Sequence, residues 1–337
     1  MKAVGFYRPL AIDAQDALVD IDLPTPELRA HDLLVRIEAI SVNPADVKVR
    51  ASAQPADGQA RVLGYDAVGV VEATGPEVRL FQKGDAVFYA GVIDRPGAYA
   101  ELHAVDERIV GRKPATLDAA HAAALPLTSL TAWELLFDRL KAPYGPQFSN
   151  DAILIINGAG GVGSILTQMA RRLTGLTVIA TASRPESIAW CRQMGAHHVI
   201  DHRQPLEEGL KAIGIPEVRY VASLTASDQH QKSIVSVLAP QGALAMIDDP
   251  ATFDIVPFKR KSLSVHWELM FTRPLYSTAD LAAQHRILDE VAALIDAGVL
   301  RTTFREDYGP INAANLKRAH AALESGRSIG KIVLSGF

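Results

Sequence analysis

A glycine-rich run in the middle of the chain has the residue types and spacing of a phosphate-binding loop. It reads Gly158-Ala159-Gly160-Gly161-Val162-Gly163 and follows an apolar stretch at 152–156. In such a loop the first glycine allows a tight turn, the second lets the backbone approach a pyrophosphate, and the third lets the next helix pack closely on the strand. The N–H groups that begin this helix then bind the anion. We therefore expect residues 158–163 to bind a dinucleotide; the simpler alternative is a glycine turn that only joins two elements.

The residues after the next apolar stretch, 177–182, indicate which dinucleotide is bound. An acidic side chain there accepts hydrogen bonds from the ribose 2′-hydroxyl of NAD, but this chain has Ser183-Arg184. Arginine offers a planar, charge-assisted fork to phosphate oxygens, so the pair favours the 2′-phosphate of NADP(H). We expect Thr225 and Lys331 to contact the same cofactor. Alternatively, Arg184 is a solvated residue in the first turn of the following helix.

An alternation of strands and helices from residue 152 onward must position these side chains. An apolar strand, a glycine turn and a helix recur, which indicates βαβ units and a parallel sheet with helices on both faces. Residues 1 to about 120 instead read as short strands with turn residues between them, which indicates a mostly-β domain. A helix at Tyr276 to Ala297 and a strand at Gly330 to Leu334 follow, and this tail is expected to return to the first domain. In the alternating part we expect strands at 152–156, 177–181, 198–200, 219–223 and 242–247, and helices at 162–173, 185–194 and 228–238.

Length and composition restrict the class of protein. The chain has 337 residues, enough for two domains of roughly 150 residues each. Its 48% hydrophobic and 21% charged residues are typical of globular proteins and argue against disorder, collagen and coiled coil. The net charge is -4, whereas a nucleic-acid-binding protein usually has an excess of basic residues.

The single cysteine, Cys191, indicates the compartment. One cysteine makes neither an intrachain disulfide nor a multi-cysteine zinc site, so a reducing cytoplasm is expected. The N-terminus lacks the apolar run of a signal peptide, and no run of about 18 apolar residues follows. We therefore expect a cytoplasmic protein that binds neither a membrane nor nucleic acid.

Short segments spread over nearly the whole chain match one family pattern. They are Ser41 to Asp46, Gly64 to Val71, Gly84 to Val87, Gly97 to Glu101, Leu130 to Trp133, the loop 158–163, and Gly330 to Val333. Together they resemble the medium-chain dehydrogenase/reductase superfamily, and within it the zinc-free quinone oxidoreductase-like branch. The resemblance implies an α/β protein with a GroES-like, mostly-β catalytic domain at 1–124 and 265–337. It also implies an inserted Rossmann domain with a doubly wound parallel sheet at 125–264, and an active site in the cleft between the two domains.

The positions of the superfamily's zinc ligands hold other residues in this chain. Several members are alcohol dehydrogenases whose catalytic zinc is held by Cys, His, and Cys or an acid. Here Asn43 stands at the first cysteine position and Tyr65 at the histidine position. Zinc favours thiolate, imidazole and carboxylate ligands, so these residues are poor ligands. We therefore expect no bound metal.

Without zinc, fewer of the superfamily's reactions are accessible to this chain. Oxidation of a simple alcohol loses its main source of transition-state stabilisation when no Lewis acid is present. Reduction of a conjugated carbonyl needs only a few hydrogen-bond donors, because the substrate delocalises the developing charge. The resemblance therefore implies transfer of hydride from NADPH to a quinone or to the β-carbon of an enone. The expected catalytic residues are Asn43, Tyr65 and, beside the nicotinamide, Thr131; a loop-fixing asparagine and a packed tyrosine are the alternatives.

Other residues of the family pattern have weaker implications. Asp46 matches a family acid, and without zinc we expect it to make structural hydrogen bonds. Gln54 stands where many quinone oxidoreductases have a tyrosine. The segment Leu263 to Leu269 alternates like an edge strand, which needs covering, and the family commonly forms dimers through such a strand. We therefore expect a homodimer.

Two clusters of titratable residues lie near the expected strand ends. The first, His197-His198 with Asp201-His202, is interpreted as the third strand and its exit rather than as a metal site. The second, Asp248-Asp249-Pro250, is interpreted as a turn that borders the nicotinamide pocket. Two rival functions remain open: a zinc-dependent alcohol dehydrogenase, and a non-catalytic NADPH-binding protein, because a fold does not fix function.

Overall fold

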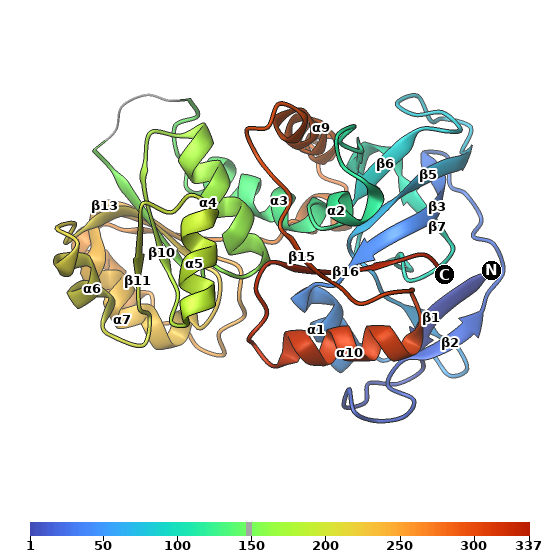
Figure 1. Ribbon diagram of the computed structural model, residues 1–337, viewed down its shortest axis with the longest axis horizontal. Coiled ribbons are helices and arrows are strands. Elements are labelled where there is room, and N and C mark those ends of the chain that lie inside the picture. The colour runs from blue at the N-terminus through green and yellow to red at the C-terminus, as the bar shows by residue number, and fades with distance from the viewer. Residues whose placement is uncertain (146–149) are drawn as a thin grey trace. The chain divides into compact units, whose positions relative to one another are not determined.

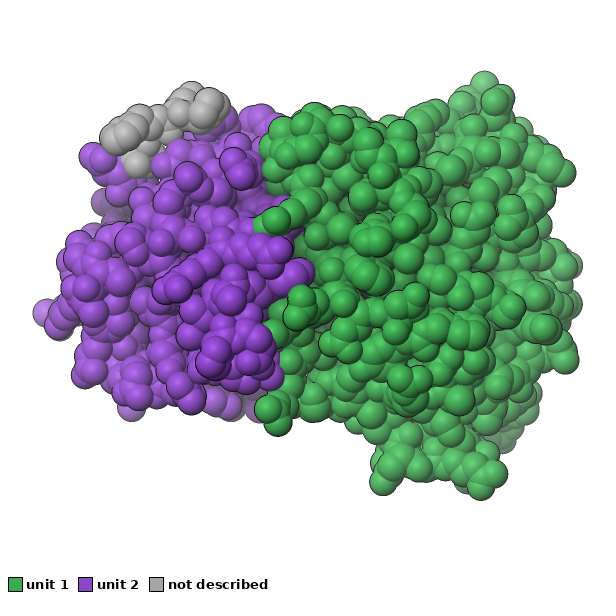
Figure 2. All heavy atoms as spheres, in the orientation of Figure 1, with its two compact units in different colours: residues 1–130, 271–337 green, residues 131–270 purple. Residues whose placement is uncertain are grey.

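The computed structural model describes residues 1–145 and 150–337, which divide into two compact units. Unit 1 comprises Met1–Leu130 and Phe271–Phe337, and unit 2 comprises Thr131–Met270, as Figure 2 shows by colour. Unit 2 is therefore inserted into the sequence of unit 1. No helix formed by the described residues is long and apolar enough to cross a membrane.

Unit 1 is built around β3 (Asp32–Ser41), a ten-residue strand of the seven-stranded sheet found among the described residues. β3 pairs with β5 (Ala67–Thr74) and β7 (Leu102–Asp106), and also with β16 (Lys331–Ser335) from the end of the chain. Val333 lies opposite Ser41, so the predicted final strand returns to the first part of the chain (Figure 1).

The remaining elements of unit 1 complete two sheets and surround them with short helices. A three-stranded sheet has the order β2-β1-β4, and the large sheet has the order β15-β16-β3-β5-β6-β8, with β7 on β3. The strands are β1 (Lys2–Phe6), β2 (Val19–Asp22), β4 (Arg61–Val62), β6 (Ala86–Tyr89), β8 (Val110–Arg112) and β15 (Phe304–Asp307). The helices are α1 (Pro44–Ser52), η1 (Glu107–Ile109), α2 (Ala119–Ala123), α3 (Pro126–Trp133, which runs into unit 2), α8 (Thr272–Leu275), α9 (Ala283–Asp296) and α10 (Ala313–Glu324).

Unit 2 is built on a parallel sheet whose described strands have the order β11-β10-β9-β12-β13-β14. The chain runs from β9 outward through β10 and β11, and then returns to β12 on the other side of β9. The strand order therefore reverses between β9 and β12, as in a doubly wound fold. The strands are β9 (Ala152–Ile156), β10 (Thr177–Thr181), β11 (His198–Ile200), β12 (Val218–Ser223), β13 (Leu238–Met246) and β14 (Ser264–Trp267). The helices are η2 (Glu134–Arg139), α4 (Gly161–Leu173), α5 (Pro185–Gln193), α6 (Leu206–Ala212), α7 (Ser227–Val237) and η3 (Val256–Lys261).

Apolar side chains explain why β9 lies inside this sheet. All five residues of β9 are buried, as a strand covered on both faces requires. Figure 1 shows α4 and α5 side by side, and the Trp190 indole of α5 donates to the Ser164 hydroxyl of α4 at 2.8 Å. The predicted strands at 152–156, 177–181 and 198–200 are confirmed.

The predicted helix at Tyr276 to Ala297 was wrong in its first part, because α9 begins at Ala283. Ser277 has a φ of 45°, in the left-handed region, which is incompatible with a continuing helix. Asp280 then accepts hydrogen bonds from Thr278 Oγ1 at 2.6 Å and from Arg273 Nε at 2.9 Å. These side-chain contacts hold a turn where apolar periodicity alone indicated a helix.

Candidate active site

A buried polar network lies in unit 1 where β3 ends and α1 begins. The Lys331 ammonium donates to Val42 O and Asp66 Oδ2, each at 3.0 Å, and to Asn43 Oδ1. The amide nitrogen of Asn43 donates to Asp66 Oδ2 at 2.8 Å and to Tyr65 O at 3.3 Å. Since an ammonium has three protons, each donor of Lys331 has an acceptor inside unit 1. The predicted contact of Lys331 with the cofactor remains a prediction, and it is one that this network does not support.

Asp66 and Asp46 are the two carboxylates at this network. Asp66 also accepts hydrogen bonds from Ser41 Oγ and from Leu127 N, both at 2.7 Å. Asp46 accepts from the backbone N–H of Asn43 at 2.8 Å and of Gly64 at 3.0 Å, and the first of these bonds caps α1. Burial raises the pKa of Asp46 to about 7, although these bonds and the Lys331 ammonium act in the opposite direction. The structural hydrogen bonds expected for Asp46 are therefore present.

Tyr65 is fully buried, and its hydroxyl proton has no acceptor among the described residues, although the Arg61 guanidinium interacts with the hydroxyl oxygen. Its ring packs edge-on against Phe271, with the two ring centroids 5.4 Å apart. Burial raises the pKa of Tyr65 to about 12; the Asp46 charge adds to the rise, and the Arg61 guanidinium partly offsets it. The phenol is therefore protonated at neutral pH, and it is a hydrogen-bond donor with an acceptor still to be supplied. Buried polar groups nearly always have partners, so this hydroxyl needs an explanation.

The glycine loop of unit 2 is tied to the end of β10. Asn157 N donates to Thr181 Oγ1 at 3.0 Å, and Gly158 N donates to Thr181 O at 3.1 Å. Asn157 has a φ of 66°, so the chain turns sharply just before the first glycine. The loop ends in α4, whose first-turn N–H groups have no acceptor within the helix.

Close approach of the backbone explains two of the glycines. A Cβ at Gly158 would lie 2.6 Å from the Cβ of Ala180, and a Cβ at Gly163 would lie 2.3 Å from Asn157 O. At Gly160 the three atoms nearest to an added Cβ all belong to Asn157, and Nδ2 is the nearest of them at 3.1 Å. The first and third glycines thus serve packing, and the second stands at the position that this type of loop keeps free of a Cβ for a pyrophosphate.

The other residues expected at the cofactor lie at the edges of unit 2. Ser183 and Arg184 follow β10, both half-buried, and Arg184 Nε is 3.7 Å from Glu186 Oε1. Thr225 is exposed after β12, whereas Thr131 is buried in α3. The sheet brings Ser183 and Thr225 to the carboxyl edge that also holds the glycine loop, because they follow parallel neighbours of β9.

Sequence reasoning missed the side-chain bonds of two residues at this edge. Asp248 accepts hydrogen bonds from both the backbone N–H and the hydroxyl of Ser227, the first residue of α7. His202 Nδ1 lies 3.1 Å from Thr181 Oγ1, and so it connects the exit of β11 to the strand that holds the glycine loop. The only signal for either residue was a polar side chain directly after an apolar strand.

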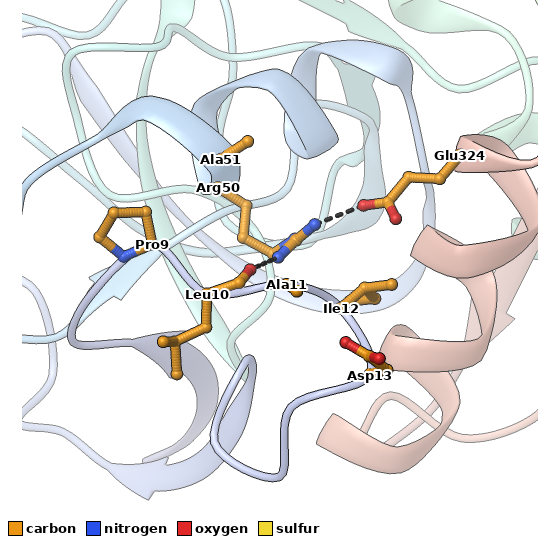
Figure 3. Close-up of a pocket in the computed structure, with 8 residues that line it drawn as sticks. All are labelled: Pro9, Leu10, Ala11, Ile12, Asp13, Arg50, Ala51 and Glu324. Atoms are coloured by element: carbon orange, nitrogen blue, oxygen red, sulfur yellow. Dashed lines mark hydrogen bonds and ion pairs between the residues drawn. The ribbon is translucent and has the colours of Figure 1, made fainter.

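A separate hollow of about 590 Å³ lies in unit 1, and none of the expected site residues is among those that line it. Figure 3 shows Arg50 crossing it to Glu324 of α10, and Arg50 also donates to Leu10 O. Arg50 is buried by these contacts, which link α1, α10 and the N-terminal segment. The lining residues are Pro9, Leu10, Ala11, Ile12, Asp13, Arg50, Ala51 and Glu324.

Comparison with known proteins identifies the family of this chain. Residues 29–115 match the family described as alcohol dehydrogenase GroES-like domain, and residues 194–334 match the family described as zinc-binding dehydrogenase. A zinc-type alcohol dehydrogenase-like protein of Staphylococcus aureus is 39% identical over 341 residues, which cover 99% of this chain and 100% of that protein. The chain belongs to the medium-chain dehydrogenase/reductase superfamily.

Two further relatives agree with this membership. A quinone oxidoreductase of Pseudomonas aeruginosa is 33% identical over 318 residues, covering 93% of this chain and 94% of that protein. The crystal structure of a Rhizobium etli protein described as a zinc-dependent alcohol dehydrogenase has 56% identity and a TM-score of 0.96, covering 100% of this chain and 98% of that one. The predicted fold class, a GroES-like domain with a Rossmann domain, is confirmed, and the protein is an oxidoreductase of this superfamily.

The zinc that the family name implies does not fit the residues of this medium-chain dehydrogenase/reductase. The Asn43 amide and the Tyr65 phenol are poor zinc ligands, and Asn43 Oδ1 already accepts from the Lys331 ammonium. Asp66 binds the same ammonium, so a second cation there would be repelled. Within residues 1–145 and 150–337, no group of three or more His, Cys, Asp or Glu side chains is placed to hold a metal ion.

Proposed function

We propose that this medium-chain dehydrogenase/reductase reduces quinones or α,β-unsaturated carbonyls with NADPH and without a catalytic zinc. The observation that carries the proposal is the Tyr65 hydroxyl, a buried donor whose proton has no acceptor among the described residues. A donor aimed at a carbonyl oxygen stabilises the charge that develops there during reduction. The raised pKa of Tyr65, about 12, keeps the donor proton in place at neutral pH.

The residues of unit 2 are suited to hold NADP(H). In the proposal, the N–H groups at the start of α4 bind the pyrophosphate, and Ser183 and Arg184 bind the 2′-phosphate. When bound, the nicotinamide supplies the hydride. The glycine loop supports this assignment, because Gly160 leaves its outer face free of a Cβ.

The remaining expected residues have supporting roles in the proposed site. Asn43 donates to Tyr65 O at 3.3 Å, so it can fix the backbone that carries the phenol. Lys331 holds Asn43 from the other side, and its charge is paired with the Asp66 carboxylate. Thr131, buried in α3, is proposed as the neighbour of the nicotinamide.

The test is an assay of NADPH oxidation against a panel of quinones, enones and aldehydes, together with metal analysis of the purified protein. We expect turnover with quinones or enones, less than one zinc per ten chains, on the order of adventitious content, and no loss of activity after chelation. Stoichiometric zinc with alcohol or aldehyde turnover would instead support a zinc-dependent alcohol dehydrogenase, which is how the Rhizobium etli protein is described. Binding of NADPH without turnover on any substrate would support a non-catalytic binding protein.

A homodimer in a reducing, cytoplasmic setting completes the proposal. β14 is an edge strand of the sheet in unit 2, and Trp267 and Leu269 beside it are 54% and 50% exposed. An open edge with exposed apolar side chains needs covering, and a second copy of β14 supplies that cover. Cys191 is buried and burial raises its pKa to about 12, so the thiol is unreactive and has no role in the chemistry.

A further inference from the structure

A turn with a strained backbone follows β12. Ala226 has φ 52° and ψ 37°, in the left-handed region that a residue with a Cβ rarely adopts. It stands between exposed Thr225 and buried Ser227. Such backbone conformations persist only where the surroundings enforce them, and they concentrate at ligand-binding sites.

A set of side-chain bonds from the end of β13 enforces this turn. Asp248 accepts from Ser227 N at 2.8 Å through Oδ2 and from Ser227 Oγ at 2.5 Å through Oδ1. Ser227 Oγ also lies 2.7 Å from Ser223 Oγ, at the end of β12. Because the Ser227 proton goes to the carboxylate, the Ser223 hydroxyl donates to Ser227. The three side chains fix the first residue of α7 to the ends of two neighbouring strands.

Sheet topology places the turn beside the glycine loop. β12 pairs directly with β9, with Ser223 opposite Ile156. Residues 157–163 and 224–226 therefore leave adjacent strands at the same edge. The strand order reverses between these two strands, and a dinucleotide binds in the crevice at such a point.

In a doubly wound fold that binds a dinucleotide, each half of the sheet binds one half of the ligand. The strands β9, β10 and β11 with the glycine loop form one such half, which in the proposed function binds the adenosine side through Ser183 and Arg184. The strands β12, β13 and β14 form the other half. Segment 224–226 thus borders the nicotinamide half of the crevice.

We propose that Asp248 is a positioning residue for the nicotinamide half of the cofactor. Asp248 holds Ser227, and through Ser227 it keeps Ala226 left-handed, so that segment 224–226 forms a fixed wall of the crevice. The carboxylate acts through this segment and does not touch the cofactor. This inference rests on the proposed binding of NADP(H).

The test compares the whole cofactor with its adenosine half. The dissociation constants of NADPH and of adenosine 2′,5′-bisphosphate are measured by calorimetry for the full-length wild-type protein and for Asp248→Ala. We expect the constant for NADPH to rise about tenfold and the constant for the bisphosphate to stay within about twofold. If Asp248 had a purely structural role, its loss would weaken the binding of both ligands equally. Equal changes in the two dissociation constants, or no change in either, would therefore overturn the inference.

Two further variants guard against loss of folding and against a general charge effect. Asp248→Asn keeps one acceptor for Ser227 N, so an intermediate rise in the constant for NADPH is expected. Asp228→Asn removes an exposed carboxylate from the first turn of the same helix, and both constants should remain unchanged. An effect of Asp228→Asn as large as that of Asp248→Ala would show that only the charge at the helix end matters.

A second substitution tests the link through Ala226. Glycine adopts the left-handed conformation without the penalty of a Cβ. Adding Ala226→Gly to Asp248→Ala should therefore restore most of the lost NADPH affinity, and the absence of recovery would contradict the proposed link. If the wild-type protein binds neither ligand, the proposed cofactor itself fails and the inference fails with it. If the wild type binds both ligands but Asp248→Ala behaves like the wild type, only the inference fails.

Discussion

At the scale of single residues, the Tyr65 hydroxyl separates activity from stability. Its proton has no acceptor among the described residues, so its removal costs only the contact of the hydroxyl oxygen with the Arg61 guanidinium. We expect Tyr65→Phe to change the free energy of unfolding by less than about 1 kcal/mol. The variant is expected to be as stable as the wild type or slightly more stable, because a buried hydroxyl proton without an acceptor is itself unfavourable. Loss of a donor to the developing oxyanion should lower kcat/KM for an enone about 100-fold.

The matched control for this prediction is Tyr89→Phe. The Tyr89 hydroxyl lies 3.0 Å from His103 Nδ1, so this variant loses a real hydrogen bond. It should cost about 1 kcal/mol of stability and leave kcat/KM unchanged. Chemical denaturation and steady-state kinetics measure both quantities. A Tyr65→Phe variant that is unstable but fully active would reverse the assignment and make Tyr65 a packing residue.

The buried ion pair between Lys331 and Asp66 is a second feature that single substitutions can test. Both side chains are buried, with the ammonium 3.0 Å from Oδ2. Lys331→Met leaves an uncompensated buried carboxylate, and we expect it to cost about 3 to 5 kcal/mol in free energy of unfolding. The double variant with Asp66→Asn should be less unstable than the sum of the single changes, by about 1 to 3 kcal/mol. Additive single effects in a double-mutant cycle by urea denaturation would show that the pair is not coupled.

At the scale of elements, a histidine links β6, β7 and the loop between them. His103 of β7 donates from Nε2 to Pro96 O at 2.9 Å, and its Nδ1 accepts from Tyr89 of β6. Burial lowers the pKa of His103 to about 4 from 6.5. The unfolded chain therefore takes up a proton below about pH 6.5, while the folded chain does not until about pH 4. Stability from this group is fully present above pH 6.5 and falls as the pH drops, by about 1.4 kcal/mol per pH unit.

This pH dependence is tested by difference, because other groups titrate in the same range. Asp46, with a pKa of about 7, acts in the opposite direction on acidification. We expect the stability advantage of the wild type over His103→Gln to shrink by about 2 kcal/mol between pH 7 and pH 5. Tyr89→Phe keeps the titrating imidazole, so its difference from the wild type should stay nearly constant over this range. A constant difference for His103→Gln would mean that His103 is protonated in the folded state.

Prediction from sequence succeeded at this scale where the signals are local. The strands β9, β10 and β11 and the glycine loop follow from apolar runs and glycine spacing within a few residues. The network of Asn43, Asp66 and Lys331 does not, because 288 positions separate Lys331 from Asn43 and only the pairing of β16 with β3 brings them together. The bond between Asp248 and Ser227 likewise spans 21 positions and depends on the neighbouring ends of β12 and β13. The polar residues were visible in the sequence, but their partners were set by the topology of the sheets.

At the scale of the whole molecule, the open edge at β14 predicts a second copy of the chain. Among the described residues, β14 pairs with β13 on one side only, with Leu244 opposite Val265 and Met246 opposite Trp267. Two copies of the strand can pair across a two-fold axis, because such an interface uses the same surface patch on both subunits. The pairing would join two sheets and bury Trp267 and Leu269, which a lone subunit exposes by about half.

A substitution at this edge should therefore change the oligomeric state without changing cofactor binding. Trp267→Glu places a charge where the second copy would pack, and burying an unpaired charge is strongly unfavourable. We expect light scattering to show a dimer for the wild type and a monomer for Trp267→Glu, with equal affinity for NADPH. Tyr276→Glu is the matched control, since Tyr276 is 76% exposed but lies outside this sheet, and this variant should remain a dimer. A wild-type monomer, or a Trp267→Glu dimer as stable as the wild type, would mean that β14 is not the contact and that its edge is covered in another way.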